Sequence, residues 1–209
     1  MAHPPGPGTR PPRYRIARGR RPMSGRPLPR GLGELDARAY AAVARMPAPE
    51  AVDAAVRTLS RAANHSKISF TIAALLATRP GRPRLAAATG LGAVGVASVG
   101  ANLLAKRLAR RPRPPRAEPG PFPRRHVVMP HSASFPSGHT ASAVAFAVAV
   151  GKVLPTMAAP LGALAAIVGY SRVHTGVHYP GDVAGGAALG AASAALVLNA
   201  SRATRRSVH

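Results

Sequence analysis

The chain has 209 residues, among which 29 Lys and Arg outnumber 6 Asp and Glu, so its formal net charge is +23. Hydrophobic residues still make up 46% of the chain, which means that the charge is concentrated in particular segments. The sequence contains no Cys, and this excludes disulfides, thiolate metal sites and a cysteine nucleophile.

The first 31 residues form a strongly basic segment. They include 8 Arg and 8 Pro but no acidic residue, and they show no apolar periodicity. Such a segment cannot bury enough surface to offset its chain entropy. We therefore predict a disordered basic tail over residues 1–31 and a second, short basic tail over residues 201–209.

Residues 32–63 are typical of two short amphipathic helices. The first is predicted over 35–46 and the second over 50–63, with prolines between them. In the second, apolar residues recur at helical spacing and form one face. That face consists of Val52, Ala55, Val56 and Leu59. These helices are expected at the membrane interface or packed on the protein, and neither is expected to span a membrane.

The remainder of the chain is apolar in long stretches. Residues 85–105 are uncharged over 21 positions, which is enough to cross about 30 Å of hydrocarbon. Residues 140–171 contain one charge, and residues 183–199 contain none. A shorter apolar run, 68–78, is a marginal further span. The prediction is an all-α integral-membrane bundle of about four or five spans; the alternative is a soluble Ala-rich bundle.

Residues 140–171 determine the predicted topology. One helix of 32 residues would be about 48 Å long, too long for a single crossing. Because Pro155 and Pro160 fall near the middle, two helices of about 16 residues fit better. Two crossings return the chain to the side it left, so the segments near His139 and Arg172 are expected on one membrane face.

Three polar clusters are expected on that face. The first begins at Lys106, which is one of only three lysines, and reaches Arg113 after six residues. Lysine supplies a mobile charge and arginine a planar fork, a combination suited to phosphate oxygens. The alternative is a flank of cations that reach from a span end to the interface.

The second cluster lies directly before an apolar helix. Ser137 is placed as its N-cap, Gly138 allows close backbone approach, and His139 follows. The exposed N–H groups of a helix start bind oxyanions. The alternative is an ordinary capped helix with an interfacial histidine.

The third cluster contains Arg172, His178 and Asp182. We expect the carboxylate of Asp182 to orient the imidazole of His178 and to make its other nitrogen more nucleophilic. His174, His178 and Asp182 are spaced by four, which suggests a metal face as an alternative. Pro180 and Gly181 should break the helix before Asp182, so we predict no metal and no cofactor.

Taken together, the clusters resemble the three-part signature of the type 2 phosphatidic acid phosphatase superfamily. The residues that carry the resemblance are Lys106, Arg113 and Pro114; Pro136, Ser137, Gly138 and His139; and Ser171, Arg172, His178 and Asp182. The resemblance implies a membrane phosphatase core over about residues 64–200.

The resemblance also implies a mechanism without a metal. His178 would attack phosphorus to form a phosphohistidine, Asp182 would orient it, and His139 would protonate the leaving group. The phosphoryl oxygens would be held by Lys106, Arg113, Ser137, Gly138 and Arg172. The implied reaction is hydrolysis of a lipid phosphate monoester or diphosphate, with a polyprenyl-linked or phosphatidic-acid-like substrate.

Two other function classes fit parts of the pattern. Vanadate-dependent haloperoxidases share the anion site but are larger and soluble. A basic membrane-binding or nucleic-acid-binding protein would explain the arginines, but arginine without interleaved aromatics provides little specificity, so no specific nucleic acid is expected. The predicted location is the cell membrane, with several spans. The positive-inside rule fits either orientation of the motif face, and the sequence leaves the oligomeric state open.

Overall fold

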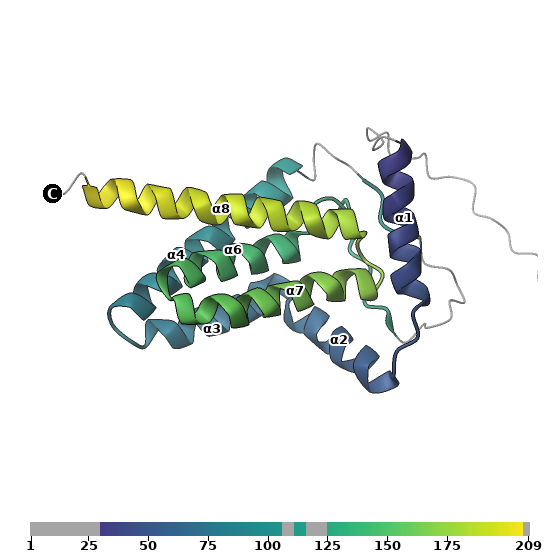
Figure 1. Cartoon of the computed structure of the whole chain (residues 1–209), viewed down its shortest axis with the longest axis horizontal. Helices are drawn as coiled ribbons and strands as arrows, with labels where there is room; N and C mark the ends of the chain where they lie inside the picture. The colour runs from purple at the N-terminus through teal and green to yellow at the C-terminus, as the bar shows by residue number, and fades with distance from the viewer. Residues whose placement is uncertain (1–29, 106–110, 116–124, 207–209) are drawn as a thin grey trace, which may run out of the picture.

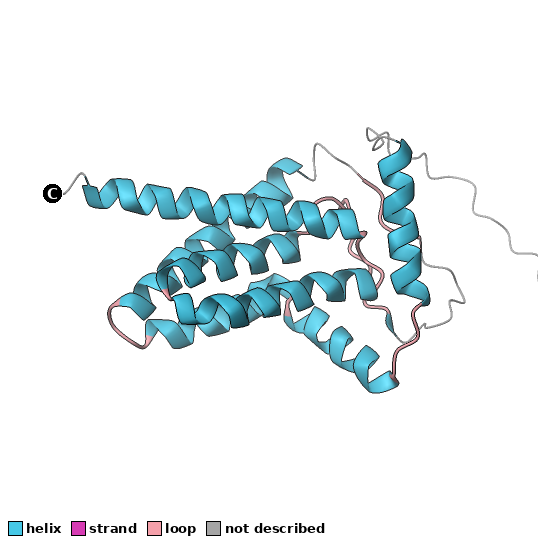
Figure 2. Ribbon diagram, viewed as in Figure 1, coloured by secondary structure: helices cyan, strands magenta, loops and turns pink. Residues whose placement is uncertain are grey.

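The computed structural model describes residues 30–105, 111–115 and 125–206, and this part of the chain is helical, with no β-strand (Figure 2). The elements are α1 (Arg30–Arg45), α2 (Glu50–Ala62), η1 (Asn64–Ser66), α3 (Lys67–Ala77), α4 (Arg82–Val99), η2 (Gly100–Ala105), α6 (Gly138–Val153), η4 (Pro155–Met157), α7 (Ala158–His174) and α8 (Pro180–Arg206). The predicted all-α class is confirmed. The expected tail 1–31 lies outside the described residues except for its last two, which begin α1.

The described helices include three that are long and apolar enough to cross a membrane. They comprise Arg82–Asn102, Pro155–His174 and Pro180–Ala203. The apolar helix α6 is shorter, with 16 residues, and α3 has 11. The predicted bundle of about four or five spans is therefore matched approximately, with α6 as a fourth, short apolar helix. Helix α8 continues to Arg206, so residues 201–206 of the expected basic tail are helical.

The predicted division of residues 140–171 into two helices is confirmed. Helix α6 ends at Val153, and the backbone leaves the helical conformation at Leu154 before the short η4 turn. Proline at position 155 disfavours the helical conformation for the residue before it, which explains the break. Helix α7 then runs back along α6 (Figure 1).

The core of the bundle is built from small residues. Helix α6 packs against α4, α7 and α8. Between α4, α6 and α8 the fully buried residues are all alanines: Ala93, Ala97, Ala141, Ala145, Ala149 and Ala194. A Cβ atom at Gly190 would collide with the carbonyl oxygen of Ala141, so this glycine allows α8 to approach α6 closely. Small residues at helix contacts are typical of membrane bundles.

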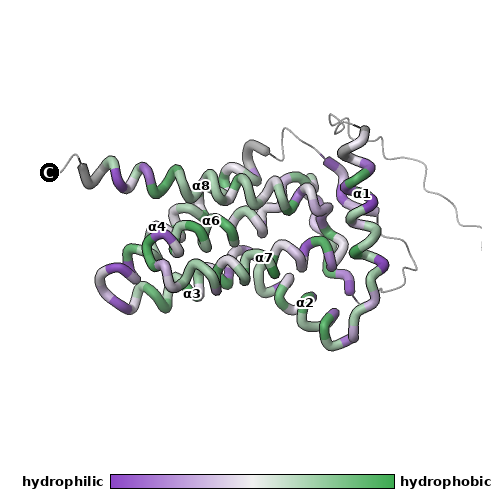
Figure 3. The backbone as a smooth tube through the Cα atoms, in the orientation of Figure 1, coloured by the Kyte–Doolittle hydropathy of each residue, from purple (hydrophilic) through white to green (hydrophobic). Residues whose placement is uncertain are grey.

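Helices α1 and α2 lie at one end of the bundle. Figure 1 shows α1 crossing this end, next to the start of α8 and the end of α7. Hydrophilic segments gather there, whereas the middle of the bundle is mainly hydrophobic (Figure 3). The motif segments begin α6, end α7 and begin α8, so the fold brings them to this same end.

Helix α2 packs on the bundle through polar residues. Its buried residues are the polar Asp53 and Ser60, whereas Val52 from the predicted apolar face is 44% exposed. The helix therefore turns its polar side toward α7 and its apolar side outward. This orientation suits a helix at a membrane interface, where apolar side chains contact lipid.

Candidate active site

The start of α6 forms one wall of the site. Ser137 is the N-cap, as predicted, and its hydroxyl oxygen accepts hydrogen bonds from the backbone N–H of Thr140 at 3.4 Å and from the Thr140 hydroxyl at 3.0 Å. The N–H of Ser137 donates to the carbonyl oxygen of Asp182 at 2.9 Å, which ties this loop to α8. Gly138 follows as the first residue of the helix and lines a cavity.

Asp182 is fully buried in the first turn of α8. Its carboxylate accepts hydrogen bonds from the backbone N–H of Tyr179 at 2.8 Å, from Arg111 at 2.7 Å and from the Ser134 hydroxyl. Asp182 is the third residue of α8, and Tyr179 is the N-cap of that helix. A carboxylate at the third position can accept a hydrogen bond from the backbone N–H of the N-cap residue, as it does here. Asp182 is therefore held rigidly and serves the helix start without being its N-cap.

His178 lies between this carboxylate and a guanidinium group. Its Nδ1 is 3.4 Å from Asp182 Oδ2, and its Nε2 is 3.3 Å from an Arg113 nitrogen. Only 2% of the residue is exposed. Burial, together with the nearby charges of Arg113 and Arg172, lowers the pKa of His178 from 6.5 to about 4, although Asp182 acts to raise it. The imidazole is therefore neutral at physiological pH.

The two arginines of the motifs are held by oxygen acceptors. Arg113 donates to the carbonyl oxygens of Val177 at 2.6 Å and Ser132 at 3.0 Å. Arg172 is 2% exposed and donates to the hydroxyl of Ser60 at 2.6 Å and to its carbonyl oxygen at 3.2 Å. These hydrogen bonds hold both guanidinium groups in place at the motif end of the bundle.

His139 follows Gly138 in the first turn of α6 and lines a cavity of about 780 Å³. Its Nε2 is 2.9 Å from the side-chain oxygen of Asn64 in η1. Gly138, His139 and Arg172 all line this cavity, whereas His178 is covered by Arg113 and does not. Lys106, the first residue of the predicted phosphate clamp, lies outside the described residues.

The structure separates His174 from the other residues of the alternative metal face. Its Nε2 lies 2.7 Å from Asp53 of α2, and its Nδ1 lies 3.1 Å from the hydroxyl of Tyr170. Asp53 also holds the nearly buried Arg125 at 3.0 Å. Helix α7 ends at His174, so the four-residue spacing does not continue to His178 and Asp182 on one helix.

Several supporting residues were not predicted from the sequence. Besides Asn64 and Ser60, the most prominent is Arg111, whose guanidinium joins Asp182 at 2.7 Å to Asp36 of α1 at 2.6 Å. The same guanidinium lies over the ring of Tyr179, 4.0 Å from its centroid. Asp36 also accepts a hydrogen bond from the N–H of Gly181 at 2.7 Å. A useful signal was available, because acidic residues are rare in this chain and Asp36 is one of only six.

The contacts of Asp36 predict how α1 is attached. In the Asp36→Ala variant, Arg111 loses one of its two carboxylates in a mostly buried site, which should lower the free energy of unfolding by about 3 kcal/mol. Hydrogen exchange of α1 should accelerate relative to that of α6. The control on the same helix is Glu34→Ala, which breaks a mostly exposed 3.9 Å pair with Arg38 and should cost less than about 0.5 kcal/mol. Equal effects of the two variants would show that Asp36 does not anchor the helix.

Comparison with known proteins identifies relatives that are phosphatases. Over 150 residues the chain is 39% identical to a decaprenylphosphoryl-5-phosphoribose phosphatase of Mycobacterium tuberculosis, covering 69% of this chain and 77% of the relative. Over 72 residues it is 40% identical to the undecaprenyl-diphosphatase BcrC of Bacillus subtilis, covering 32% and 37% of the two chains.

Two solved structures have the same fold. One is a transmembrane PAP2-type phosphatidylglycerolphosphate phosphatase from Bacillus subtilis, with a TM-score of 0.64, 24% identity, and coverage of 82% of this chain and 87% of the other. The second is LpxE from Aquifex aeolicus, with a TM-score of 0.63, 23% identity, and coverage of 79% and 95%. The family model of the PAP2 superfamily matches residues 84–206, more than half of the chain. The chain therefore belongs to the PAP2 superfamily, the family that its three-part motif resembles.

Proposed function

We propose that the protein hydrolyses a lipid phosphate monoester through a phosphohistidine at His178, without a metal ion. The observation that carries the proposal is the setting of this imidazole, with one nitrogen facing Asp182 and the other facing the Arg113 guanidinium. A neutral imidazole whose free nitrogen faces a cation is arranged to attack an anion that the cation attracts.

The first step transfers the phosphoryl group to the protein. A phosphate monoester draws the Arg113 guanidinium onto its own oxygens, which uncovers Nε2 of His178. The lone pair of Nε2 attacks phosphorus, and the bond from phosphorus to the leaving oxygen breaks with its electron pair on that oxygen. His139 supplies the proton that converts the leaving alkoxide into an alcohol.

The second step returns the protein to its starting state. Water attacks phosphorus of the phosphohistidine while His139, now neutral, accepts a proton from that water. The bond from phosphorus to nitrogen breaks, inorganic phosphate leaves, and His178 is again neutral. Arg113, Arg172, Ser137 and the N–H of Gly138 bind the phosphoryl oxygens in both steps, with Lys106 as a further cation.

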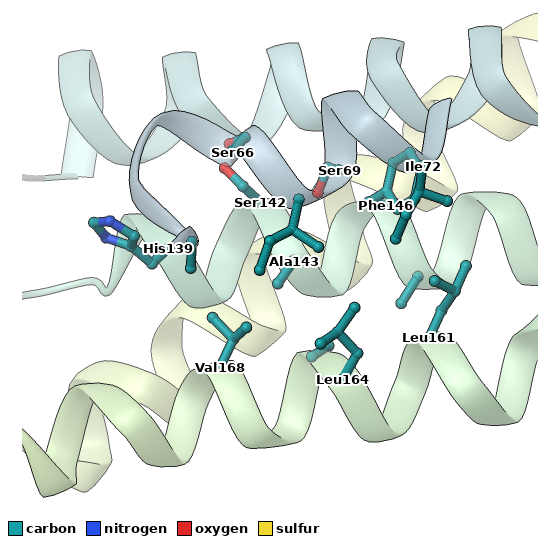
Figure 4. A pocket seen from close by; sticks show the side chains of 14 residues that line it. Ser66, Ser69, Ile72, His139, Ser142, Ala143, Phe146, Leu161, Leu164 and Val168 are labelled. Carbon is teal, nitrogen blue, oxygen red and sulfur yellow. The ribbon is translucent and has the colours of Figure 1, made fainter. Parts of the chain in front are cut away.

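An apolar slot next to His139 supports a lipid substrate. Figure 4 shows His139 at one end of this slot, which runs between α3, α6 and α7. Its apolar lining includes Ile72, Phe146, Leu161, Leu164 and Val168. The slot has a volume of only about 30 Å³, so it provides an apolar surface and not room for a whole chain. Because the slot and the larger cavity share His139, this apolar surface adjoins the place proposed for the phosphate.

The substrate class follows from the relatives and from the cavity. One curated relative is a decaprenylphosphoryl-5-phosphoribose phosphatase, so we propose a prenyl-linked phosphate as substrate and the cell membrane as location. Phosphatidic acid is the second candidate, because the apolar residues beside His139 do not distinguish one hydrocarbon chain from another. The orientation of the motif face in the membrane is the part of this proposal that the positive-inside rule leaves open.

The proposed function is tested with the detergent-solubilised protein. Phosphate release is measured in excess EDTA from a prenyl-phosphoryl-ribose phosphate, a prenyl diphosphate, phosphatidic acid and phosphatidylglycerophosphate. We expect release from at least one of them, with the prenyl-linked substrates preferred, and inhibition by vanadate, which imitates five-coordinate phosphorus. Loss of turnover on chelation, with recovery on adding a divalent ion, would contradict the metal-independent mechanism. Halide oxidation by peroxide in the vanadate-loaded protein would favour the haloperoxidase alternative.

The depressed pKa of His178 predicts a measurable titration. Because the folded pKa of about 4 lies below the ordinary 6.5, the folded imidazole stays neutral and nucleophilic as the pH falls to about 5. The unfolded form binds a proton earlier, so acidification from pH 6.5 to 4 should destabilise the fold. Histidine NMR spectra should contain one signal, absent in His178→Asn, with a midpoint near pH 4. A midpoint near 6.5 would show that His178 is not buried between cations.

A further inference from the structure

The cavity in front of His139 is much larger than one phosphate group requires. Its volume of about 780 Å³ is in the range of sites that enclose whole drug-sized ligands. Gly138, His139 and Arg172 account for one wall, and the lining also includes Ser98, Asn102 and Ser142. Polar side chains of this kind can bind the hydroxyl groups of a spacer next to the phosphate.

A second group of basic residues forms another wall of the same cavity. Arg61 belongs to the last turn of α2, His65 lies in η1, and Lys67 is the first residue of α3. Among the described residues, the lining of the cavity includes no Asp or Glu. Within residues 30–105, 111–115 and 125–206, the structure gives neither Arg61 nor Lys67 a carboxylate at ion-pair distance. The charges of Arg61 and Lys67 are therefore available to attract an anion from outside the chain.

The second group of basic residues adjoins both His139 and the apolar slot. The side-chain oxygen of Asn64, which precedes His65, accepts the 2.9 Å hydrogen bond from Nε2 of His139. Ile68, which follows Lys67, lines the apolar slot together with Ser66 and Ser69. Arg61, His65 and Lys67 thus lie along the chain beside residues that contact His139 and residues that line the slot. A lipid substrate that reaches from His139 to the slot passes beside them.

We propose that Arg61, His65 and Lys67 form a second anion subsite, which binds the phosphodiester of a substrate that carries two phosphates separated by a polar spacer. This inference rests on the proposed function. The terminal monoester lies at His178 and is hydrolysed, the spacer occupies the polar middle of the cavity, and the phosphodiester lies at Lys67. The hydrocarbon chain attached to the phosphodiester then contacts the apolar surface of the slot at Ile68. The enzyme would thereby select a lipid-phosphoryl-sugar phosphate over a lipid with one phosphate.

The test compares two synthetic substrates with the same hydrolysed phosphate and the same prenyl chain. One is a prenyl-phosphoryl-ribose 5-phosphate, and the other is a prenyl ribose 5-phosphate in which an ether replaces the phosphodiester. Lys67→Met and Arg61→Gln should each lower kcat/KM for the first substrate by about fivefold, because loss of one exposed charge contact costs up to about 1 kcal/mol. For the ether substrate, kcat/KM should change by less than about twofold.

The matched control is Lys152→Met. Lys152 is an exposed lysine in the last turn of α6, at the opposite end of that helix from His139. It should change neither rate, and circular dichroism checks that all variants are folded. Equal losses of Lys67→Met on both substrates, or no loss on either, would overturn the subsite while leaving the proposed function intact. A wild-type protein that hydrolyses neither substrate, nor phosphatidic acid, would overturn the proposed function and the subsite with it.

Discussion

Replacement of His178 by alanine is expected to lower kcat on every phosphate substrate by on the order of 10⁴-fold or more. The variant lacks the nitrogen that forms the covalent intermediate, and the loss should therefore not depend on the leaving group. Phosphate release from a prenyl-linked phosphate and from p-nitrophenyl phosphate provides the measurement, at equal protein concentration and in excess EDTA.

The control for this variant is His131→Ala. His131 lies in the loop before α6 and is exposed, and it has no place in the proposed chemistry. Its replacement should leave both rates within about twofold. A His178→Ala protein that remains folded and retains a tenth or more of the wild-type rate would exclude His178 as the nucleophile.

Replacement of His139 by alanine should cause a loss of activity whose size depends on the leaving group. An alkoxide leaving from a lipid alcohol needs a proton, and loss of a general acid typically costs about 10²–10⁴-fold. A p-nitrophenolate is a stable anion and largely needs none. The measurement is the rate of phosphoryl transfer to the protein in a single turnover. In the variant this rate should fall strongly with the lipid phosphate and much less with p-nitrophenyl phosphate.

The hydrogen bond between His139 and Asn64 makes a structural role the main competing explanation. Asn64→Ala removes this partner and keeps the imidazole, so it separates the two explanations. If His139 acts as the acid, Asn64→Ala should be clearly less harmful on the lipid phosphate than His139→Ala. Equal losses of His139→Ala on the two substrates would show that it binds phosphate or supports the fold, and its assignment as the acid would be withdrawn.

The apolar pattern of the sequence was sufficient to predict most of the fold. The helix break within residues 140–171 follows from Pro155, which restricts the backbone of Leu154 whatever the tertiary context. The common end of the motifs follows from counting crossings of the membrane. The helix break is a local property and the common end of the motifs is a topological one, and both can be predicted from the sequence alone.

The packing of α2 could not be predicted in the same way. Its periodicity correctly indicated a helix with an apolar face, but not which environment that face contacts. Asp53 and Ser60 face inward because Arg125, His174 and Arg172 offer partners there. Those partners lie more than 70 residues away in the sequence, so their proximity appears only in the folded chain.

The supporting contacts of the candidate site were missed for a related reason. The signature names the groups proposed to touch the phosphate, but it contains no information on what holds them. Arg111 is not part of the signature, and its position between Asp36 and Asp182 depends on how α1 crosses the bundle. In a chain with a net charge of +23, the scarce aspartates are the better guide, since Asp36, Asp53 and Asp182 each contact an arginine.

The covalent intermediate is tested most directly by trapping it in the His139→Ala variant with p-nitrophenyl phosphate. The first step then proceeds without an acid, while the second is slowed because no base activates water. Mass spectrometry of the quenched protein should locate an acid-labile phosphoryl group on His178, in an amount approaching one per chain. A phosphoryl group on any other residue, or release of p-nitrophenol without a burst and without a labelled protein, would contradict the phosphohistidine mechanism.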